Sequence, residues 1–125
     1  MMVDGNILII DDEPDLLEVM RGRLESEGYE VITSSDGSNG IEKAKSHLPD
    51  LIIIDVMMPG IDGFEVLEKI KEYDETKRIP VLIFSSGSEE EVLAKKALSL
   101  GAAGYIVKPF KTDALLFTVN KFIRK

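Results

Sequence analysis

Leu51-Ile52-Ile53-Ile54-Asp55 is an uninterrupted apolar run that ends in a carboxylate, and it indicates the fold of the chain. Consecutive apolar, mostly β-branched residues without polar alternation are typical of strands that are covered on both faces, as in a parallel sheet. Similar runs lie at residues 7–10 and 81–84, and shorter ones lie at residues 31–33 and 105–107. The sequence therefore predicts five strands.

The segments between these runs have the apolar spacing of helices that bury one face. Pro14 stands where a helix is expected to begin, while Gly28, Gly101 and Gly104 stand where helices are expected to end. Strand and helix alternate five times along the chain. This order predicts an α/β domain in which a doubly wound parallel sheet lies between helices.

The composition limits the classes of function. The chain has 125 residues, no cysteine and a formal net charge of −8, so one domain is expected, without disulfides or thiolate metal sites. The acidic balance argues against direct binding to nucleic acid or to an anionic membrane surface, because both need basic groups on the protein. No apolar stretch approaches the length of a membrane span, and the start lacks the pattern of a signal peptide. We therefore expect a cytoplasmic protein.

Chemically active side chains follow the predicted strands where each strand ends. Asp11 and Asp12 follow the first apolar run, Asp55 the third, Ser85 the fourth and Lys108 the fifth. Because the carboxyl ends of parallel strands share one edge of a sheet, we expect these side chains to lie close together. Clustered carboxylates favour a hard divalent cation such as Mg²⁺. A cation, a lysine and a hydroxyl around a nucleophilic carboxylate suit a transferring phosphoryl group, so the chemistry indicated is phosphorylation of an aspartate.

Each of these residues alone has an ordinary structural explanation. A single aspartate after a strand is usually a turn former or a helix cap, and this interpretation is favoured for Asp36, Asp50 and Asp62. A single lysine is usually a solvated surface residue. The coincidence across four strand ends favours the functional interpretation, because turn chemistry does not require this combination.

Four motifs in order along the chain resemble those of response-regulator receiver domains, which are paired with sensor histidine kinases in two-component signalling. They are Ile-Leu-Ile-Ile-Asp11-Asp12-Glu13-Pro14, Ile-Asp55-Val-Met-Met-Pro59-Gly60, Phe-Ser85-Ser86 and Tyr105-Ile-Val-Lys108-Pro109-Phe110. The resemblance covers essentially the whole chain and extends to single-domain receivers of the chemotaxis type. It implies a five-stranded sheet in the flavodoxin-like order 2-1-3-4-5, with helices on both faces. We expect residues 1–125 to form one receiver domain, without an output domain in this chain.

The resemblance also implies the roles of the site residues. Asp55 is the expected phosphoacceptor, and its donor is a phospho-histidine on a sensor kinase or phosphotransfer protein. Asp11, Asp12 and Asp55 are expected to hold Mg²⁺ or Mn²⁺, together with the main-chain carbonyl of Met57. Lys108 is expected to pair with the phosphoryl group. The domain would be a signalling phosphoacceptor that assists its own phosphotransfer and autodephosphorylation, not an enzyme acting on other substrates.

The implied output is a two-state switch. The phosphoryl group draws the Ser85 hydroxyl inward, and Tyr105 rotates from a solvent-facing to a buried position. The face made by the fourth helix, fifth strand and fifth helix then changes its preference for a target protein, an output domain or a second copy of the chain. In this family the peptide bond between Lys108 and Pro109 is expected to be cis.

Other classes of protein fit the sequence less well. A flavin-binding protein shares the fold order, but its phosphate loop needs neutral donors where this chain has acidic residues 11–15. No G-x-G-x-x-G follows the first strand, which argues against a dinucleotide fold. A phosphatase with its nucleophile on the first strand would have a second aspartate where Glu13 stands. A receiver-like scaffold that is not phosphorylated and acts by protein contact is the remaining alternative.

Overall fold

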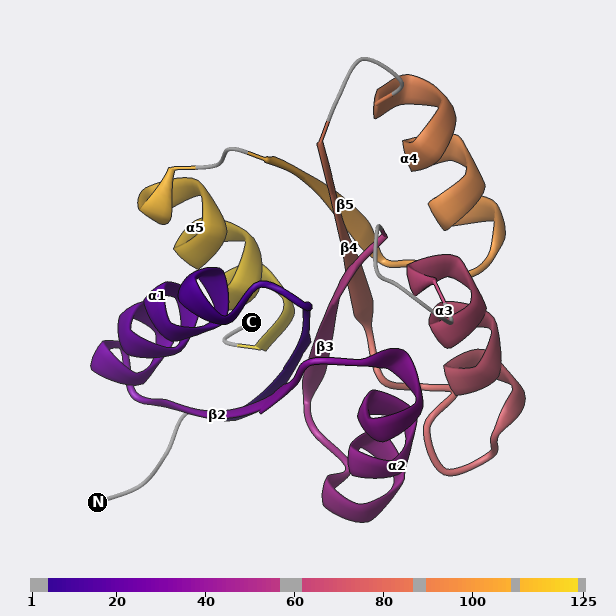
Figure 1. Cartoon of the computed structure of the whole chain (residues 1–125), viewed down its shortest axis with the longest axis horizontal. Coiled ribbons are helices and arrows are strands. Elements are labelled where there is room, and N and C mark those ends of the chain that lie inside the picture. Colours follow the sequence, from indigo (N-terminus) through magenta and orange to yellow (C-terminus); the bar gives the residue numbers. More distant parts are fainter. Residues whose placement is uncertain (1–4, 57–61, 87–89, 109–110, 124–125) are drawn as a thin grey trace.

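The computed structural model describes residues 5–56, 62–86, 90–108 and 111–123 of the chain (Figure 1). In this part, strands and helices alternate strictly, as the apolar runs predict. The elements are β1 (Gly5–Ile10), α1 (Pro14–Ser26), β2 (Tyr29–Ser34), α2 (Gly37–His47), β3 (Leu51–Asp55), α3 (Gly63–Glu72), β4 (Val81–Ser86), α4 (Glu90–Ser99), β5 (Gly104–Lys108) and α5 (Thr112–Ile123).

The five strands form one sheet in the order β2-β1-β3-β4-β5, and every neighbouring pair is parallel. The expected flavodoxin-like order is therefore confirmed. In this register Ile54 of β3 lies opposite Ile10 of β1, and Asp55 lies opposite Phe84 of β4. The ends of β1, β3 and β4 thus reach the same edge of the sheet, which we call the carboxyl rim.

The sheet is covered by helices on both faces. Helices α1 and α5 pack on one face, and α2, α3 and α4 pack on the other (Figure 1). Successive residues of β1 alternate between the two layers, because Leu8 and Ile10 belong to the core under α2 to α4 while Ile7 and Ile9 belong to the core under α1 and α5. Residues 7–10 and 51–54 are all 0% exposed, which explains their apolar runs and anchors the rim in the interior.

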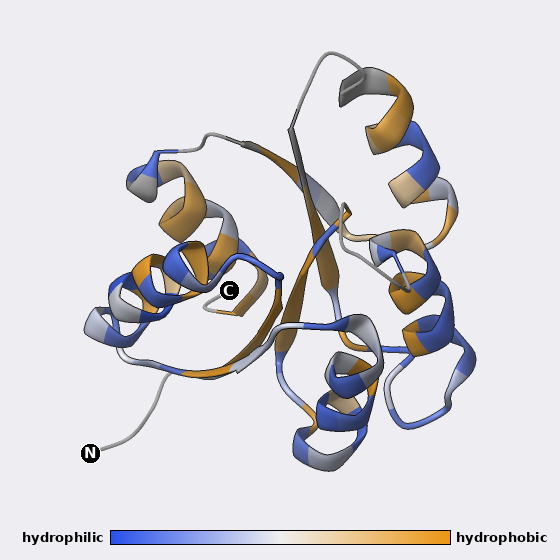
Figure 2. Ribbon diagram, viewed as in Figure 1, coloured by the Kyte–Doolittle hydropathy of each residue, from blue (hydrophilic) through white to orange (hydrophobic). Residues whose placement is uncertain are grey.

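Hydropathy follows the same arrangement. Hydrophobic residues gather on the central strands and on the helix faces turned toward them, and hydrophilic residues lie on the outward faces (Figure 2). Burial of each large aliphatic side chain contributes about 1.5–3 kcal/mol. Strands β1, β3 and β4, whose residues 7–10, 51–54 and 81–84 are all fully buried, thus hold the rim firmly.

Most of the expected helix ends are confirmed. Pro14 is the first residue of α1, and Gly28 and Gly101 adopt left-handed φ values of 96° and 102° after α1 and α4. The expectation for Gly104 is wrong, because this residue begins β5. A Cβ at Gly104 would lie 2.8 Å from Cδ2 of Leu82. Gly104 therefore belongs to a strand start that lies opposite Leu82 of β4 and not to a helix end.

Candidate functional site

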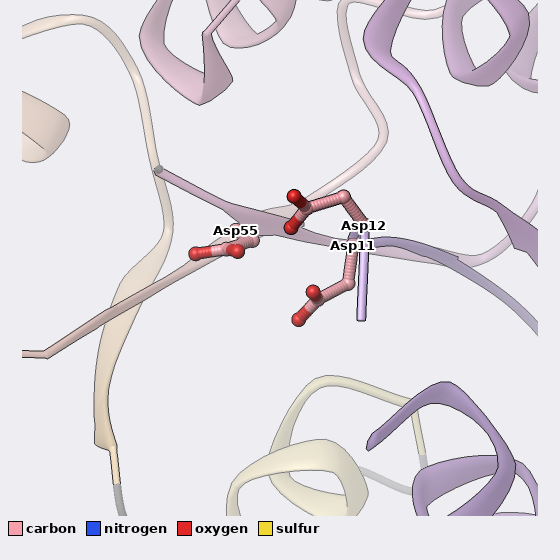
Figure 3. A group of neighbouring side chains, drawn as sticks. All are labelled: Asp11, Asp12 and Asp55. Atoms are coloured by element: carbon pink, nitrogen blue, oxygen red, sulfur yellow. The ribbon is translucent and has the colours of Figure 1, made fainter. Parts of the chain in front are cut away.

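Three carboxylates meet at the carboxyl rim (Figure 3). Asp11 and Asp12 follow β1, Asp55 ends the adjacent strand β3, and one oxygen from each lies within 4.8 Å of the others. Asp11 is 0% and Asp55 is 4% exposed, while Asp12 keeps contact with solvent. The strand order therefore brings together the three acidic residues that the sequence singled out.

Main-chain hydrogen bonds hold Asp11 in place. Its N–H donates to the carbonyl of Ser34 at the end of β2, at 3.0 Å. Its carboxylate Oδ1 accepts from the N–H of Glu13 at 3.0 Å. The Asp11 main chain is therefore fixed to the neighbouring strand, and its side chain is fixed to its own loop.

Val56, the residue that follows Asp55, is held on two sides. The N–H of Val56 donates to the carbonyl of Phe84 at 3.0 Å, and its carbonyl accepts from the N–H of Gly63 at 3.1 Å. The sequence patterns did not single out Gly63. The only sequence signal for it is its position directly after Asp62, at the start of the helix that follows the acidic strand end.

The three carboxylates fit a small divalent cation. Three like charges at this separation repel one another, and the repulsion falls when a cation lies between them. The donor set consists of oxygens only, which suits Mg²⁺ or Mn²⁺ better than softer metals. Because Mg²⁺ keeps several waters, a few carboxylates on an accessible rim are sufficient to bind it.

The other aspartates have the structural roles that were favoured for them. Asp36 caps α2 by accepting from the N–H of Asn39 at 2.8 Å, and Asp62 caps α3 by accepting from the N–H of Glu65 at 3.0 Å. Asp50 accepts from the N–H of Asn6 at 2.8 Å. Each carboxylate satisfies a main-chain donor at a helix or strand start, so none of the three needs a further function.

The remaining predicted site residues are described only in part. Ser85 follows the residue of β4 that lies opposite Asp55, and Lys108 ends β5. Their main chains therefore reach the rim, while their side chains lie outside what the structure describes. Met57 and Pro109 lie outside the described residues altogether, so the metal-ligand role of one and the cis peptide bond of the other stay predictions.

Tyr105 lies in β5, opposite Ile83 of β4. Its ring is half-buried and packs against the core on the α2-to-α4 side of the sheet. The hydroxyl oxygen is buried and has no hydrogen-bond partner in the described part of the chain. An unpaired buried hydroxyl costs free energy, so within the described part of the chain packing is what holds the ring in this position.

Comparison with known proteins agrees with the resemblance seen in the motifs. The sequence profile of the response regulator receiver domain matches residues 7–120. The chain is 37% identical over 125 residues to the alkaline phosphatase synthesis transcriptional regulatory protein PhoP of Bacillus subtilis, covering 98% of this chain and 50% of that protein. It is 39% identical over 121 residues to the response regulator ArlR of Staphylococcus aureus, covering 95% of this chain and 52% of that protein. The chain thus spans about half the length of the curated relatives it matches.

A solved structure shares the whole fold. The chemotaxis response regulator CheY4 of Vibrio cholerae superposes with a TM-score of 0.87 at 31% identity, covering 98% of this chain and 99% of that one. A response regulator from Chloroflexus aurantiacus superposes with a TM-score of 0.89 at 28% identity, covering 97% and 98%.

The relatives bear on two other expectations. PhoP is by name a transcriptional regulator, so the expectation that nucleic acid is not a partner is not supported. No helix in the parts of the chain that the structure describes has the length and apolar content needed to cross a membrane.

The sheet order, the three carboxylates at the carboxyl rim and the match over residues 7–120 lead to one assignment. The chain belongs to the response regulator receiver domain family of two-component signalling proteins.

Proposed function

We propose that Asp55 accepts a phosphoryl group from a phospho-histidine on a sensor kinase or a phosphotransfer protein. The observation that carries this proposal is the convergence of three carboxylate oxygens within 4.8 Å on the ends of two adjacent parallel strands. Membership of the receiver family supports it, because receivers act with such kinases. We propose further that residues 1–125 form a single receiver domain.

The chemistry needs few groups on the protein. A carboxylate oxygen of Asp55 forms a bond to phosphorus while the bond from phosphorus to the donor nitrogen breaks, and the departing imidazole keeps that electron pair. Asp11, Asp12, Asp55 and the main-chain carbonyl of Met57 would hold Mg²⁺ or Mn²⁺, which supplies positive charge next to the phosphoryl oxygens. Lys108 would pair with one of these oxygens, and the Ser85 hydroxyl would donate to another. Water would later attack the same phosphorus and restore the carboxylate.

The output face proposed is α4, β5 and α5. A phosphoryl group acts on this face only through contacts that differ between two conformations of the domain. Tyr105 is placed for such a difference, since its ring packs on the core while its hydroxyl lacks a partner in the described residues. Three of the five exposed large hydrophobic side chains described, Val92, Leu98 and Phe117, lie on α4 and α5. They suit a face that meets a target protein, an output domain or a second copy.

The proposal is tested by intact mass after incubation with Mg²⁺ and a small phosphodonor, acetyl phosphate. We expect the mass of one phosphoryl group to be gained by the wild type and by Glu30→Gln, an exposed residue of β2 that serves as a charge-matched control. No gain is expected when Mg²⁺ is removed with EDTA, or in Asp55→Asn. A wild type that gains nothing with Mg²⁺ would contradict the proposal and favour a scaffold that works without phosphorylation.

A further inference from the structure

Gly63, the first residue of α3, lies directly against the main chain of Asp55. A Cβ added to Gly63 would stand 2.3 Å from the Asp55 carbonyl oxygen and 2.8 Å from Cα of Val56. Side chains essentially never approach a neighbour within 3.0 Å in this way. Because the atoms in the way belong to the backbone, no rotamer change can relieve the overlap.

The two backbones cannot easily separate. The Gly63 N–H donates to the carbonyl of Val56 at 3.1 Å, so moving the start of α3 away would break this bond. The N–H of Val56 donates to Phe84 of β4, so moving the Asp55 peptide would strain the sheet instead. Helix α3 is itself fixed, because Phe64, which follows Gly63, is buried in the core.

We infer that Gly63 is a positioning residue for Asp55. Without a Cβ, it lets the start of α3 seat against the Asp55 carbonyl, and this contact fixes the carboxylate relative to Asp11 and Asp12. The inference rests on the proposed function, since it concerns the same cation and the same phosphoryl transfer.

The size of the displacement gives the size of the effect. To reach 3.0 Å from 2.3 Å, the Asp55 carbonyl and a Cβ at position 63 must separate by at least 3.0 − 2.3 = 0.7 Å. Functional groups must be held to within about 0.5 Å, and a displacement of about 1 Å can cost about a hundredfold in rate. Mg²⁺ is sensitive as well, because it demands near-ideal octahedral geometry. We therefore expect Gly63→Ala to lose about ten- to a hundredfold in rate.

Two other glycines provide matched controls. A Cβ at Gly22, within α1, would have nothing within 4 Å. A Cβ at Gly40 of α2 would stand 2.4 Å from Cδ1 and 2.8 Å from Cγ1 of Ile10, which are side-chain and not backbone atoms. Gly40→Ala therefore tests strained packing that does not displace the Asp55 main chain. Gly22→Ala tests a glycine-to-alanine exchange in which the added Cβ meets no neighbouring atom.

The experiment measures three quantities on the full chain. They are the Mg²⁺ dissociation constant by calorimetry, the amide shift of Val56 without metal by NMR, and the rate of phosphorylation by acetyl phosphate at saturating Mg²⁺. Circular dichroism verifies that each variant is folded, and trimethylamine N-oxide is added where needed, because it favours the folded state. We expect Gly63→Ala to move the Val56 resonance, to weaken Mg²⁺ binding, and to stay slow when Mg²⁺ is saturating. Gly22→Ala should match the wild type in all three.

Several results would overturn the inference. One is a Gly63→Ala protein whose rate and Mg²⁺ affinity lie within about twofold of the wild type, where a displaced site should lose about tenfold or more. Another is a Gly40→Ala protein that is slowed as much as Gly63→Ala. A Gly63→Ala protein that stays unfolded in the osmolyte would show that the glycine serves the fold and not Asp55. A wild type that binds Mg²⁺ but is never phosphorylated would instead refute the proposed function, while the Mg²⁺ and NMR measurements would still decide the role of Gly63.

Discussion

Replacing Asp12 by asparagine removes one of the three charges at the carboxyl rim, and we expect it to stabilise the metal-free protein. Asp12 is the suitable member of the cluster because it keeps contact with solvent, so the amide is easily accommodated. A net charge of −8 for the whole chain already opposes compaction, and the rim concentrates part of that charge in one place.

The expected gain follows from the geometry. At 4.8 Å, the outer limit of the separations between the carboxylate oxygens, two unit charges repel by about 0.9 kcal/mol in water and by about 3.5 kcal/mol at an effective dielectric constant of about 20. Asp12 faces two such charges. Because Asp12 reaches solvent, the lower figure applies to it, and salt at physiological strength reduces it further. Two repulsions of about 0.9 kcal/mol, reduced by salt, give an expected gain of about 1 kcal/mol in the free energy of unfolding.

The assay is urea unfolding of wild type, Asp12→Asn and Glu30→Gln, each in EDTA and in increasing Mg²⁺. Bound Mg²⁺ stabilises the wild type by about 2.7 kcal/mol at a concentration one hundred times the dissociation constant. Asp12→Asn has lost a charged ligand and should gain less, so the order of stabilities should reverse as Mg²⁺ rises. Glu30→Gln changes the net charge equally but lies outside the cluster, and its stability should stay within about 0.5 kcal/mol of the wild type.

Three results would refute this reasoning. The first is an Asp12→Asn protein that is less stable than the wild type in EDTA. The second is equal stabilisation of both proteins by Mg²⁺, which would place the ion elsewhere. The third is an equal gain in Glu30→Gln, which would assign the effect to the net charge of the chain and not to the rim.

Further predictions concern buried polar groups. Tyr105→Phe removes a buried hydroxyl that has no partner in the described part of the chain, and urea unfolding should show a gain of about 1 kcal/mol; a loss would mean that the hydroxyl is bonded in solution. Thr76→Val removes a 2.7 Å hydrogen bond to the carbonyl of Ile70 in a buried position, and thermal unfolding should show a loss of about 1–3 kcal/mol, against which an unchanged melting temperature would count. Burial lowers the pKa of Lys71 from 10.5. The unfolded chain therefore keeps the proton on this lysine to a higher pH than the folded chain does. Because of this difference, the contribution of Lys71 to stability rises as the pH increases from the lowered pKa toward 10.5. The difference in unfolding free energy between wild type and Lys71→Met should therefore move in favour of the wild type over that range, and parallel pH profiles would contradict it.

The parts of the fold that could be predicted from the sequence are those that depend on local pattern. Strands β1 and β3 could be predicted because residues 7–10 and 51–54 are buried on both faces, so that polar residues do not alternate with apolar ones. The carboxylates at the carboxyl rim could be predicted for the same reason, since a carboxylate directly after such a run marks the strand end. Parallel pairing then brings these ends together without further information.

The parts that could not be predicted depend on contacts between distant segments. Helix α2 ends at His47, and the next residue, Leu48, caps it with a left-handed φ of 46°, at a position where no glycine marks the turn. Pro49 follows it, and a residue before proline disfavours the right-handed helical conformation, but this signal gives a boundary and not a conformation. Gly104 was misassigned and Gly63 was overlooked because their neighbours come from distant segments, Leu82 of β4 in one case and the carbonyl of Asp55 in the other.

The same contacts indicate on which side of the sheet a charge added at Asp55 would have its effect. Residues 7–10 of β1 and residues 81–84 of β4 are all fully buried, so neither strand is free to move as a whole, and on the β1 side the N–H of Asp11 is also bonded to β2. On the other side, the peptide after Asp55 is bonded directly to β4, and the next strand carries Tyr105, whose hydroxyl lacks a partner in the described residues. Helix α4 on that side is joined to α3 by Lys96, whose Nζ lies 4.5 Å from the ring centroid of Phe64. Such a contact at an exposed position contributes only about 0.5–1 kcal/mol. The Tyr105 ring and the Lys96 contact are therefore groups on this side whose rearrangement costs little free energy, which supports placing the proposed output face on α4, β5 and α5.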